Sequence, residues 1–340
     1  MFTRIHHFNA LVLLLFVLCL LYIYRLQNQL QQSFVNPSYS VITNEISKSS
    51  NKNQQNKFED DVIVIYNRVP KTGSTSFVNI AYDLYKKNNF HVLHVNITGN
   101  AHVLSISEQL RFIRNTTRWL GRKPALYHGH FGFIDFQKYG ATLPPFYINI
   151  IRKPLDRLIS YYYFLRYGDN YRPHLVRKKH GDTMTFDECV EHKGSDCQPN
   201  LLWLQIPFLC GQSARCWIPG NVWALEEAKR NVVSKYLLVG VTEHLPDFIE
   251  VLETVLPNMF RNASNHFKYS AKSHLRKTVK KFKPSFRTVS IFKNSTIWQM
   301  ENELYKFVYE HFQFIRQHTL PDPSKGLSKF RYEKIYPKPN

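Results

Sequence analysis

The stretch VPKTGSTSF, residues 69–77, combines a lysine, a glycine and several hydroxyl residues in an order that suits anion binding. In a P-loop the glycines come first, and the lysine comes late, at the start of the helix. Here Lys71 precedes Gly73, and the hydroxyl residues around that glycine are Thr72, Ser74, Thr75 and Ser76. Backbone N–H groups at a helix N-terminus attract anions, and Gly73 would let the backbone approach one closely. The loop therefore predicts a phosphate site, with a Ser/Thr-capped helix and a surface lysine as the alternative.

A second anion site is predicted at IRKPLDRLISYYY, residues 151–163. Arg152 ends an apolar run typical of a buried strand, and Pro154 suits the first position of a helix. Ser160 would then lie on the second turn, about 9 Å along the helix axis. An arginine and a serine placed in this way could bind a second phosphate. Two separate phosphate sites, without acidic ligands for magnesium, suggest a nucleotide that carries phosphate at two positions.

The stretch YHGH, residues 127–130, could supply a base. If the chain is extended there, His128 and His130 point to the same side of the strand, and Gly129 leaves space between them. A neutral imidazole can take a proton from a hydroxyl group. From these residues alone, one buried structural histidine and one surface histidine is the simpler interpretation. His94, in HVLHV, is a weaker candidate for the same site.

The elements that must position these residues alternate between strand and helix. Strands are predicted at 62–66, 91–95, 125–130, 146–152 and 235–241, and helices at 74–86, 105–117, 154–166, 245–256 and 297–315. This alternation predicts an α/β fold with a mainly parallel sheet, and the loop at 69–77 follows its first strand, where such sheets bind ligands. Residues 167–220 carry four cysteines and little periodicity, which predicts a disulfide-stapled insertion.

The N-terminal region predicts a membrane anchor. Residues 10–24 form an unbroken apolar run, and no small-residue cleavage site follows it. The run is short for a spanning helix but suits a thin membrane, so a retained signal anchor is favoured over a cleaved signal peptide. We expect a cytoplasmic tail at 1–9, an anchor at 10–25, a flexible stem rich in Gln, Asn and Ser at 26–58, and a lumenal domain at 59–340.

Charge and sequons indicate a lumenal protein with a polyanionic partner. The formal net charge of the 340 residues is +20, which favours nucleic acid, an anionic membrane or an acidic polysaccharide as the partner. The N-glycosylation sequons are at Asn96, Asn115, Asn262 and Asn294. Glycosylation implies the secretory pathway, so nucleic acid is disfavoured and an acidic glycan is expected.

The cysteines beyond the anchor support an oxidising compartment. They form two close pairs, and the favoured disulfides are Cys189–Cys197 and Cys210–Cys216, although three connectivities are possible. A zinc site is the alternative, but CxxC spacing is absent.

The two phosphate motifs, P-K-T-x-S-T-S and R-x-P-x-x-R-x-x-S-x-Y-Y, resemble the 5′-phosphosulfate loop and the 3′-phosphate motif of Golgi carbohydrate sulfotransferases. From about residue 60 to the C-terminus, the chain is similar to the heparan sulfate 2-O-sulfotransferases in the stretches YNRVPKT, YHGH, SYYYFLR, DECV, WLQIPF, LVGVTE, SHLRKT and YEKIYPK. Gly73 and Lys153 stand where Ala and Asp are usual in the vertebrate family, and neither change removes a liganding side chain.

The resemblance implies a P-loop-like sulfotransferase fold that uses 3′-phosphoadenosine 5′-phosphosulfate (PAPS) as donor, without a metal. Lys71 would lie at the oxygen that bridges phosphate and sulfate, where charge builds as the sulfuryl group departs. His130 would be the general base and His128 its assistant. The donor would also contact residues 72–76 of the loop. Its 3′-phosphate would be held by Arg152, Ser160, Ser273, Arg276 and Thr278.

The resemblance also implies an acceptor and an assembly. The acceptor would be the 2-hydroxyl of a uronic acid, preferentially iduronate, in heparan sulfate, with Arg68, His94 and Arg177 on its side of the site. In the family the C-terminal tail packs against a neighbouring subunit and the enzyme is a homotrimer, which implies the same assembly here. Together with the predicted anchor, the resemblance implies a Golgi membrane protein with its catalytic domain in the lumen. The alternatives are a uronyl 2-sulfotransferase acting on dermatan or chondroitin sulfate, a non-catalytic heparin-binding protein on the same fold, and a lumenal P-loop kinase.

Overall fold

The computed structural model of the chain describes Tyr22, Arg25 and residues 61–97, 99, 101–270, 278 and 280–320. The predicted tail and stem lie outside these residues, and so does the predicted anchor apart from Tyr22 and Arg25. Within the described part of the chain, no helix has the length and apolar character needed to cross a bilayer.

A five-stranded sheet forms the centre of the domain, and its strand pairs are parallel. The strands are β1 Ile63–Asn67, β2 His91–Val95, β3 Ala125–Gly129, β4 Phe146–Ile151 and β5 Tyr236–Val241. Their order is β2-β3-β1-β4-β5, so the strands that follow β1 in the chain lie on both sides of it. Open α/β sheets bind ligands at such a reversal, beyond the carboxyl ends of the strands. The predicted α/β fold with a mainly parallel sheet is confirmed.

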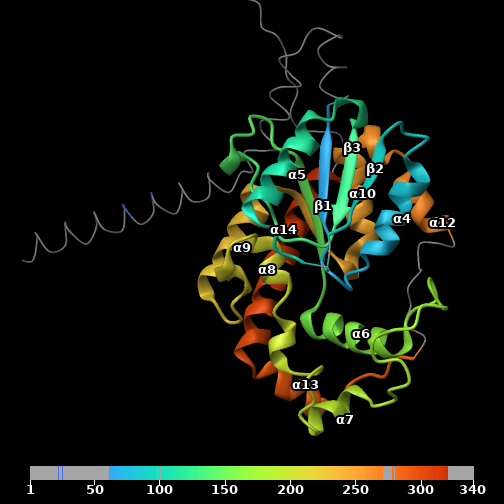
Figure 1. Cartoon of the computed structure of the whole chain (residues 1–340), viewed down its shortest axis with the longest axis vertical. Coiled ribbons are helices and arrows are strands. Elements are labelled where there is room, and N and C mark those ends of the chain that lie inside the picture. The colour runs from blue at the N-terminus through green and yellow to red at the C-terminus, as the bar shows by residue number, and fades with distance from the viewer. Residues whose placement is uncertain are drawn as a thin grey trace, which may run out of the picture.

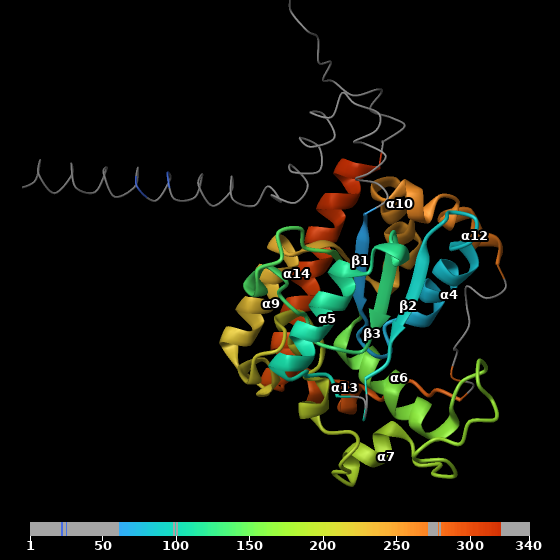
Figure 2. The same cartoon turned by 45° about the horizontal axis from the view of Figure 1, so that its top comes forward.

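Helices cover both faces of the sheet (Figure 1). The longer ones are α4 Ser74–Leu84, α5 Ile106–Arg118, α6 Pro154–Tyr167, α9 Val222–Ser234, α10 Leu245–Val255 and α14 Thr296–Thr319. The shorter ones are α7 Phe186–Glu191, α8 Gln205–Cys210, α11 Pro257–Phe260, α12 Ala263–Tyr269 and α13 Phe286–Lys293. Figures 1 and 2 show α5, α9 and α14 on one side of the sheet, α4, α10 and α12 on the other, and α6 beyond the tips of the strands.

Alternate residues of each central strand enter two different hydrophobic cores, because successive side chains of a strand point to opposite faces. Along β1, Ile63 and Ile65 pack with one core, whereas Val64 and Tyr66 pack with the other. Every residue of β1 and β3 is buried. Burial on both faces explains why these strands are nearly continuous apolar runs in the sequence.

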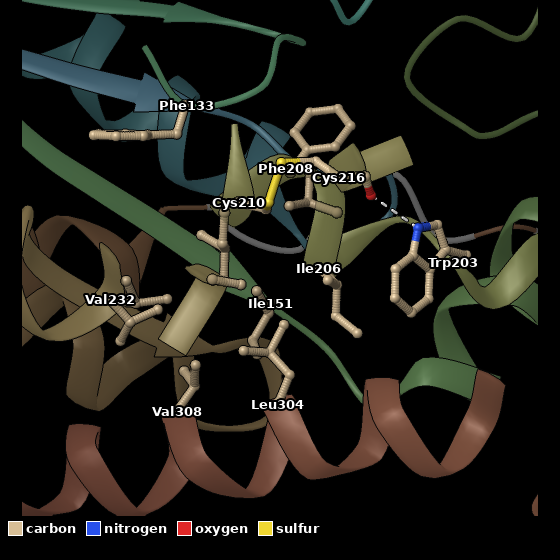
Figure 3. Close-up of a cluster of buried hydrophobic side chains, with 14 of the residues drawn as sticks. Phe133, Ile151, Trp203, Ile206, Phe208, Cys210, Cys216, Val232, Leu304 and Val308 are labelled. Carbon is tan, nitrogen blue, oxygen red and sulfur yellow. Dashed lines mark hydrogen bonds between the residues drawn. A yellow bond between two sulfur atoms is a disulfide. The ribbon is translucent and has the colours of Figure 1, made fainter. Parts of the chain in front are cut away.

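The predicted insertion contains α7, α8 and two local disulfides. These join Cys189 to Cys197 and Cys210 to Cys216, which are the pairs that the spacing favoured. Figure 3 shows the second disulfide inside a buried cluster, where the Trp203 indole N–H donates to the Cys216 carbonyl over 3.0 Å.

The helix α8 of the insertion belongs to the main core rather than lying on its surface. Ile206 of α8 shares a buried cluster with Ile151 at the end of β4 and with Leu304 of α14 (Figure 3). The structure thus adds α7–α9 and α11–α13 to the expected elements. Of these, α7 and α8 have six residues each, too few to show a period of their own, and packing onto the core stabilises them.

Candidate active site

The loop after β1 has an unusual backbone at two positions. Lys71 and Gly73 have positive φ angles, 69° and 77°, and Gly73 is the N-cap of α4. Glycine adopts this conformation easily, whereas a lysine there stores about 1–3 kcal/mol of strain. The first turn of a helix leaves backbone N–H groups without intrahelical partners. The loop therefore presents Lys71 and the N-terminal N–H groups of α4 at the carboxyl edge of the sheet.

The hydroxyl groups of the loop are not equivalent. Thr72 is buried, and its hydroxyl donates to a main-chain carbonyl of the same loop over 3.0 Å. Ser74 is buried too, and its oxygen accepts from Arg68 Nη2 over 3.3 Å. Ser76 is buried and Thr75 is half-buried in the first turn of α4. Thr72 would therefore offer a phosphate its N–H and not its hydroxyl hydrogen.

Hydrogen bonds tie this loop to the ends of two neighbouring strands. Arg152, which follows β4, donates from Nη1 to the Lys71 carbonyl over 3.2 Å. The Thr242 hydroxyl, beyond β5, lies 2.8 Å from the Thr72 carbonyl and 2.9 Å from the Ile151 carbonyl. The two phosphate motifs predicted from the sequence thus meet at one edge of the sheet.

Side chains around Arg152 add positive charge. Burial, followed by the nearby Arg152 charge, lowers the pKa of Lys281. Cations this close repel each other until an anion lies between them, which fits a phosphate site. Ser160 of α6 is buried and Thr278 is half-buried. The remaining residues predicted for this phosphate, Ser273 and Arg276, lie outside the described residues.

The Lys71 ammonium group lies over an aromatic ring of α6. Its Nζ is 4.0 Å from the centre of the Phe164 ring, and the guanidinium carbon of Arg177 is 4.3 Å from the same centre. Cation–π attraction favours both positions. Phe164 therefore connects the lysine predicted for the donor with the arginine predicted for the acceptor.

Ion pairs fix the segment that carries Arg177. Arg177 Nη2 lies 3.8 Å from Asp169 Oδ1, and the Asp169 side chain is fully buried. Arg166, near the end of α6, is also buried and lies 2.8 Å from Asp182 and 2.7 Å from Asp196. Residues 166–182 are thereby held at both ends beside the site.

His128, on β3, is buried and has a hydrogen-bond partner at each ring nitrogen. Arg68 Nη1 is 3.2 Å from its Nδ1, and the Tyr82 hydroxyl is 3.0 Å from its Nε2. Because a guanidinium can only donate, Nδ1 accepts, and the neutral ring donates from Nε2 to Tyr82. Burial, followed by the Arg68 charge, lowers the pKa of His128 to about 3, so the ring stays neutral. Its one lone pair is thus engaged by Arg68.

His130 lies just after β3 and has the opposite tautomer. Its Nδ1 is 2.8 Å from the Arg68 carbonyl oxygen, which can only accept, so Nδ1 carries the proton. The lone pair of the neutral ring is then on Nε2. Burial, followed by the Arg68 charge, lowers the pKa of His130 to about 4. Of the two histidines, His130 is the one whose tautomer suits accepting a substrate proton.

Gly129 separates these histidines for a reason that differs from the expected one. β3 ends at Gly129, so His130 lies beyond the strand. A Cβ atom at Gly129 would lie 2.6 Å from the Val95 carbonyl oxygen and 2.9 Å from the Phe131 ring. Protein atoms fill this space, so the expectation that it stays open between the histidines is wrong.

His94, at the end of β2, borders the same group. Its ring stacks on His128 with the ring centres 4.9 Å apart, and it is exposed. Partial burial, followed by the Arg68 and Arg172 charges, lowers its pKa. The structure therefore brings His94, His128, His130 and Arg68 together, and their roles in the reaction stay predictions.

The sequon asparagines Asn96, Asn115, Asn262 and Asn294 are all exposed. Exposure is the condition for carrying a glycan, so N-glycosylation at these positions stays a prediction.

A cavity of about 1450 Å³ lies at the opposite end of the sheet from these side chains. It is lined by residues around the starts of β1, β4 and β5 and by α5, including Arg111 and Arg114. None of the residues predicted for catalysis or for donor or acceptor binding lines it. The candidate active site is therefore placed at the carboxyl edge, where the charged groups converge.

The sequence profile of the Sulfotransferase family matches residues 54–308. The chain belongs to the sulfotransferase family. It is 57% identical over 281 residues to the "Heparin sulfate O-sulfotransferase" of Drosophila melanogaster, an alignment that covers 83% of this chain and 80% of that protein. It is 56% identical to the "Heparan sulfate 2-O-sulfotransferase 1" of Gallus gallus and 54% identical to that of Homo sapiens, over 286 residues, 83% of this chain and 80% of each relative.

Five side chains of this sulfotransferase that border or support the site were not expected from the sequence. They are Tyr82, Phe164, Asp169, Gln205 and Glu301. Tyr82 and Phe164 lie within predicted helices, but a single aromatic residue there is more often part of the core. Glu301 could have been found, because an acidic residue on the apolar face of a long helix is rare without a partner.

Proposed function

We propose that this sulfotransferase moves the sulfuryl group of PAPS to the 2-hydroxyl of a uronic acid, preferentially iduronate, in heparan sulfate. Arg152 contacts the Lys71 carbonyl, and His130 contacts the Arg68 carbonyl, three residues earlier in the chain. The observation that carries the proposal is this arrangement of Lys71, Arg152 and His130 at one edge of the sheet. The names and high identities of the relatives support this choice of acceptor.

The donor would lie across the two phosphate motifs. Its 5′-phosphosulfate would meet the N-terminus of α4, where Lys71, Gly73 and Thr75 face it. Its 3′-phosphate would meet Arg152 and Ser160, with the positive charge of Lys281 nearby. A doubly phosphorylated nucleotide matches these two separate groups of cations and N–H donors.

The transfer would proceed in line, with one bond formed to sulfur and one broken. The Nε2 atom of His130 would take the proton of the acceptor hydroxyl as its oxygen attacks the sulfur. The bond between sulfur and the bridging oxygen would break, and the Lys71 ammonium would stabilise the charge on that oxygen. The products would be the sulfated uronate, adenosine 3′,5′-bisphosphate and a proton that His130 returns to solvent.

The acceptor would bind on the side of Arg68, His94 and Arg177. A uronic acid carries a carboxylate, and arginine is suited to paired recognition of carboxylates and sulfates. Phe164 and the buried Asp169 hold Arg177 in place for this role.

The test uses the full chain with ³⁵S-labelled PAPS and two acceptors, N-sulfated 2-O-desulfated heparin and dermatan. We expect label at the uronate 2-position of the heparin acceptor, and its loss in His130→Ala. Preference for dermatan would contradict heparan sulfate as the acceptor but would agree with the proposed sulfuryl transfer. Heparin binding without transfer would leave only a binding protein, and transfer from ATP with Mg²⁺ would indicate a kinase.

We also propose that the protein is a single-pass Golgi membrane protein with its catalytic domain in the lumen, and that it assembles as a homotrimer. The apolar run at 10–24 and the exposed sequons support the membrane topology. A shift in mass after glycosidase treatment, together with extraction from membranes only by detergent, would test it. Light scattering of the detergent-solubilised protein would test the trimer, and a monomeric mass would contradict it.

A further inference from the structure

Glu301 is an acidic residue in the middle of the fold, and the proposed reaction does not use it. It lies on α14 and is fully buried. Its Oε1 accepts from the backbone N–H groups of Leu204, over 2.9 Å, and of Ile206, over 3.1 Å. Its Oε2 accepts from Gln205 Nε2 over 3.1 Å. A buried carboxylate is costly and often replaceable by an apolar side chain, so its presence invites a functional explanation.

Gln205 connects this carboxylate to the end of β4. Its Oε1 accepts from the Arg152 N–H over 2.8 Å, and its Nε2 donates to the Arg152 carbonyl over 2.9 Å. The side-chain amide therefore pairs with both main-chain groups of Arg152, as a neighbouring strand would. Gln205 is itself fully buried, so water does not compete for these bonds.

Glu301 determines which way the Gln205 amide faces. A carboxylate can only accept, so it holds Nε2 on its own side and leaves Oε1 for the Arg152 N–H. With the amide reversed, Oε1 would face the carboxylate and the Arg152 carbonyl, which are both acceptors. The main chain of Arg152 is thus fixed by a series of contacts that begins on α14.

A purely structural role for Glu301 is the alternative explanation. The buried Arg157 donates from Nη2 to the Leu201 carbonyl over 3.1 Å and to the Leu202 carbonyl over 3.0 Å, and its charge interacts with Glu301. These contacts would stabilise the turn before α8 whether or not Arg152 binds a ligand. These contacts do not explain why the hydrogen bonds of Glu301 continue through Gln205 to Arg152, the residue proposed to bind the donor.

We propose that Glu301 and Gln205 are positioning residues for the 3′-phosphate of the donor. Glu301 orients the Gln205 amide, and the amide fixes Arg152 so that its guanidinium meets that phosphate. The inference rests on the proposed function, in which Arg152 binds the 3′-phosphate.

The test measures binding of adenosine 3′,5′-bisphosphate and of AMP, which lacks the 3′-phosphate, to the full chain by calorimetry. Glu301→Gln keeps the side-chain size but brings an NH₂ group against another N–H donor in either orientation, so at least one hydrogen bond is lost. We expect the preference for the bisphosphate to fall about tenfold, while AMP binding changes less than about twofold.

Two further variants separate a specific effect from a general one. Glu303→Gln, on the same helix, removes an exposed carboxylate that pairs with Lys229, and we expect it to leave the preference unchanged. Gln205→Leu should lower the preference as Glu301→Gln does. The double variant should lose no more than Gln205→Leu alone, because Glu301 acts through Gln205.

Three results would overturn the inference. The first is a preference for the bisphosphate over AMP in Glu301→Gln that equals that of the wild type. The second is a double variant in which the losses of this preference add. The third is an equal loss of affinity for both nucleotides, together with a lower melting temperature. A wild-type protein that binds both nucleotides equally would contradict the proposed function itself, and the inference with it.

Discussion

The Nδ1 atom of His130 lies 2.8 Å from the carbonyl oxygen of Arg68, and this contact fixes the tautomer of the ring. The guanidinium of the same arginine contacts Nδ1 of His128 over 3.2 Å and fixes the opposite tautomer there. One residue therefore gives two neighbouring histidines different protonation patterns. Because the lone pair of His130 is on Nε2 and that of His128 is engaged, the two should differ sharply in their effect on the reaction.

We expect His130→Ala to lower kcat by about 10²–10⁴-fold, the usual contribution of a general base. Binding of adenosine 3′,5′-bisphosphate should change little, since the ring is not predicted to contact the donor. The measurement is kcat with the heparin acceptor, beside calorimetry with the nucleotide. His192→Ala, an exposed histidine at the end of α7, is the control. Activity within tenfold of wild type would exclude His130 as the base.

The pH dependence should reflect the lowered pKa of His130, which is about 4 in the free protein. The base works when neutral, so kcat/KM should persist as the pH falls below 6.5 and decline only near pH 4, since kcat/KM reports the free enzyme. Removing the Arg68 charge should raise this pKa, because that charge disfavours the imidazolium. Arg68→Gln should therefore move the acid limb of the pH profile of kcat/KM, where activity declines as the pH falls, to higher pH.

The position of the acid limb, rather than its height, is the quantity to compare, since Arg68 is also proposed to bind the acceptor. Arg118→Gln, an exposed arginine on α5, serves as the matched control. Histidine titration followed by NMR gives the same comparison without turnover. An acid limb that stays in place in Arg68→Gln would show that Arg68 does not set the pKa of His130.

Phe164 should contribute to the rate through the cations that lie over its ring. The two contacts, to Lys71 and Arg177, are each worth about 0.5–2 kcal/mol. Phe164→Leu keeps an apolar side chain but removes the ring and with it both contacts, so we expect kcat/KM to fall by about 5- to 900-fold. Phe164→Tyr, which keeps the ring, should restore most of it. Phe286→Leu, at a ring that is 88% exposed, is the control; full activity of Phe164→Leu would contradict this role.

Much of the fold could be predicted because the buried strands and long helices show clear periods. The predicted bounds of β2 agree with the structure at both ends, those of β4 differ by one residue at one end, and α6 extends one residue beyond its predicted end. The helix α9 could have been predicted as well, since Ala224, Leu225, Ala228 and Val232 form a buried face.

The candidate site likewise contains features that short stretches of sequence predict and features that depend on the folded chain. Lys71, Gly73 and Arg152 lie in local motifs whose backbone geometry follows from short stretches of sequence. The contacts of Gln205 with Glu301 join positions 96 residues apart, and nothing local marks such a partner. The tautomers of His128 and His130 depend on one arginine 60 and 62 residues away, so they too required the folded chain.

The two disulfides should affect different steps of the reaction. Each closes a short loop, with sequence separations of 8 and 6, so we expect either pair of Cys→Ser changes to cost about 2–3 kcal/mol. In a domain of this size that lowers the melting temperature by about 3–5 °C. The stability losses should therefore be similar, and the kinetic effects should separate them.

The Cys210–Cys216 pair begins at the last residue of α8. The carbonyl of Phe208 in this helix accepts from Asn67 Nδ2 over 3.1 Å and from the Phe133 N–H over 2.9 Å. Asn67 immediately precedes Arg68, so loss of this disulfide should disturb the base and lower kcat. Cys197 instead adjoins Asp196, which pairs with Arg166 and helps to hold the segment that carries Arg177. Loss of Cys189–Cys197 should therefore raise KM for the acceptor with less change in kcat. Steady-state kinetics below both melting temperatures would measure the split, and equal effects of the two variants on kcat and KM would contradict it.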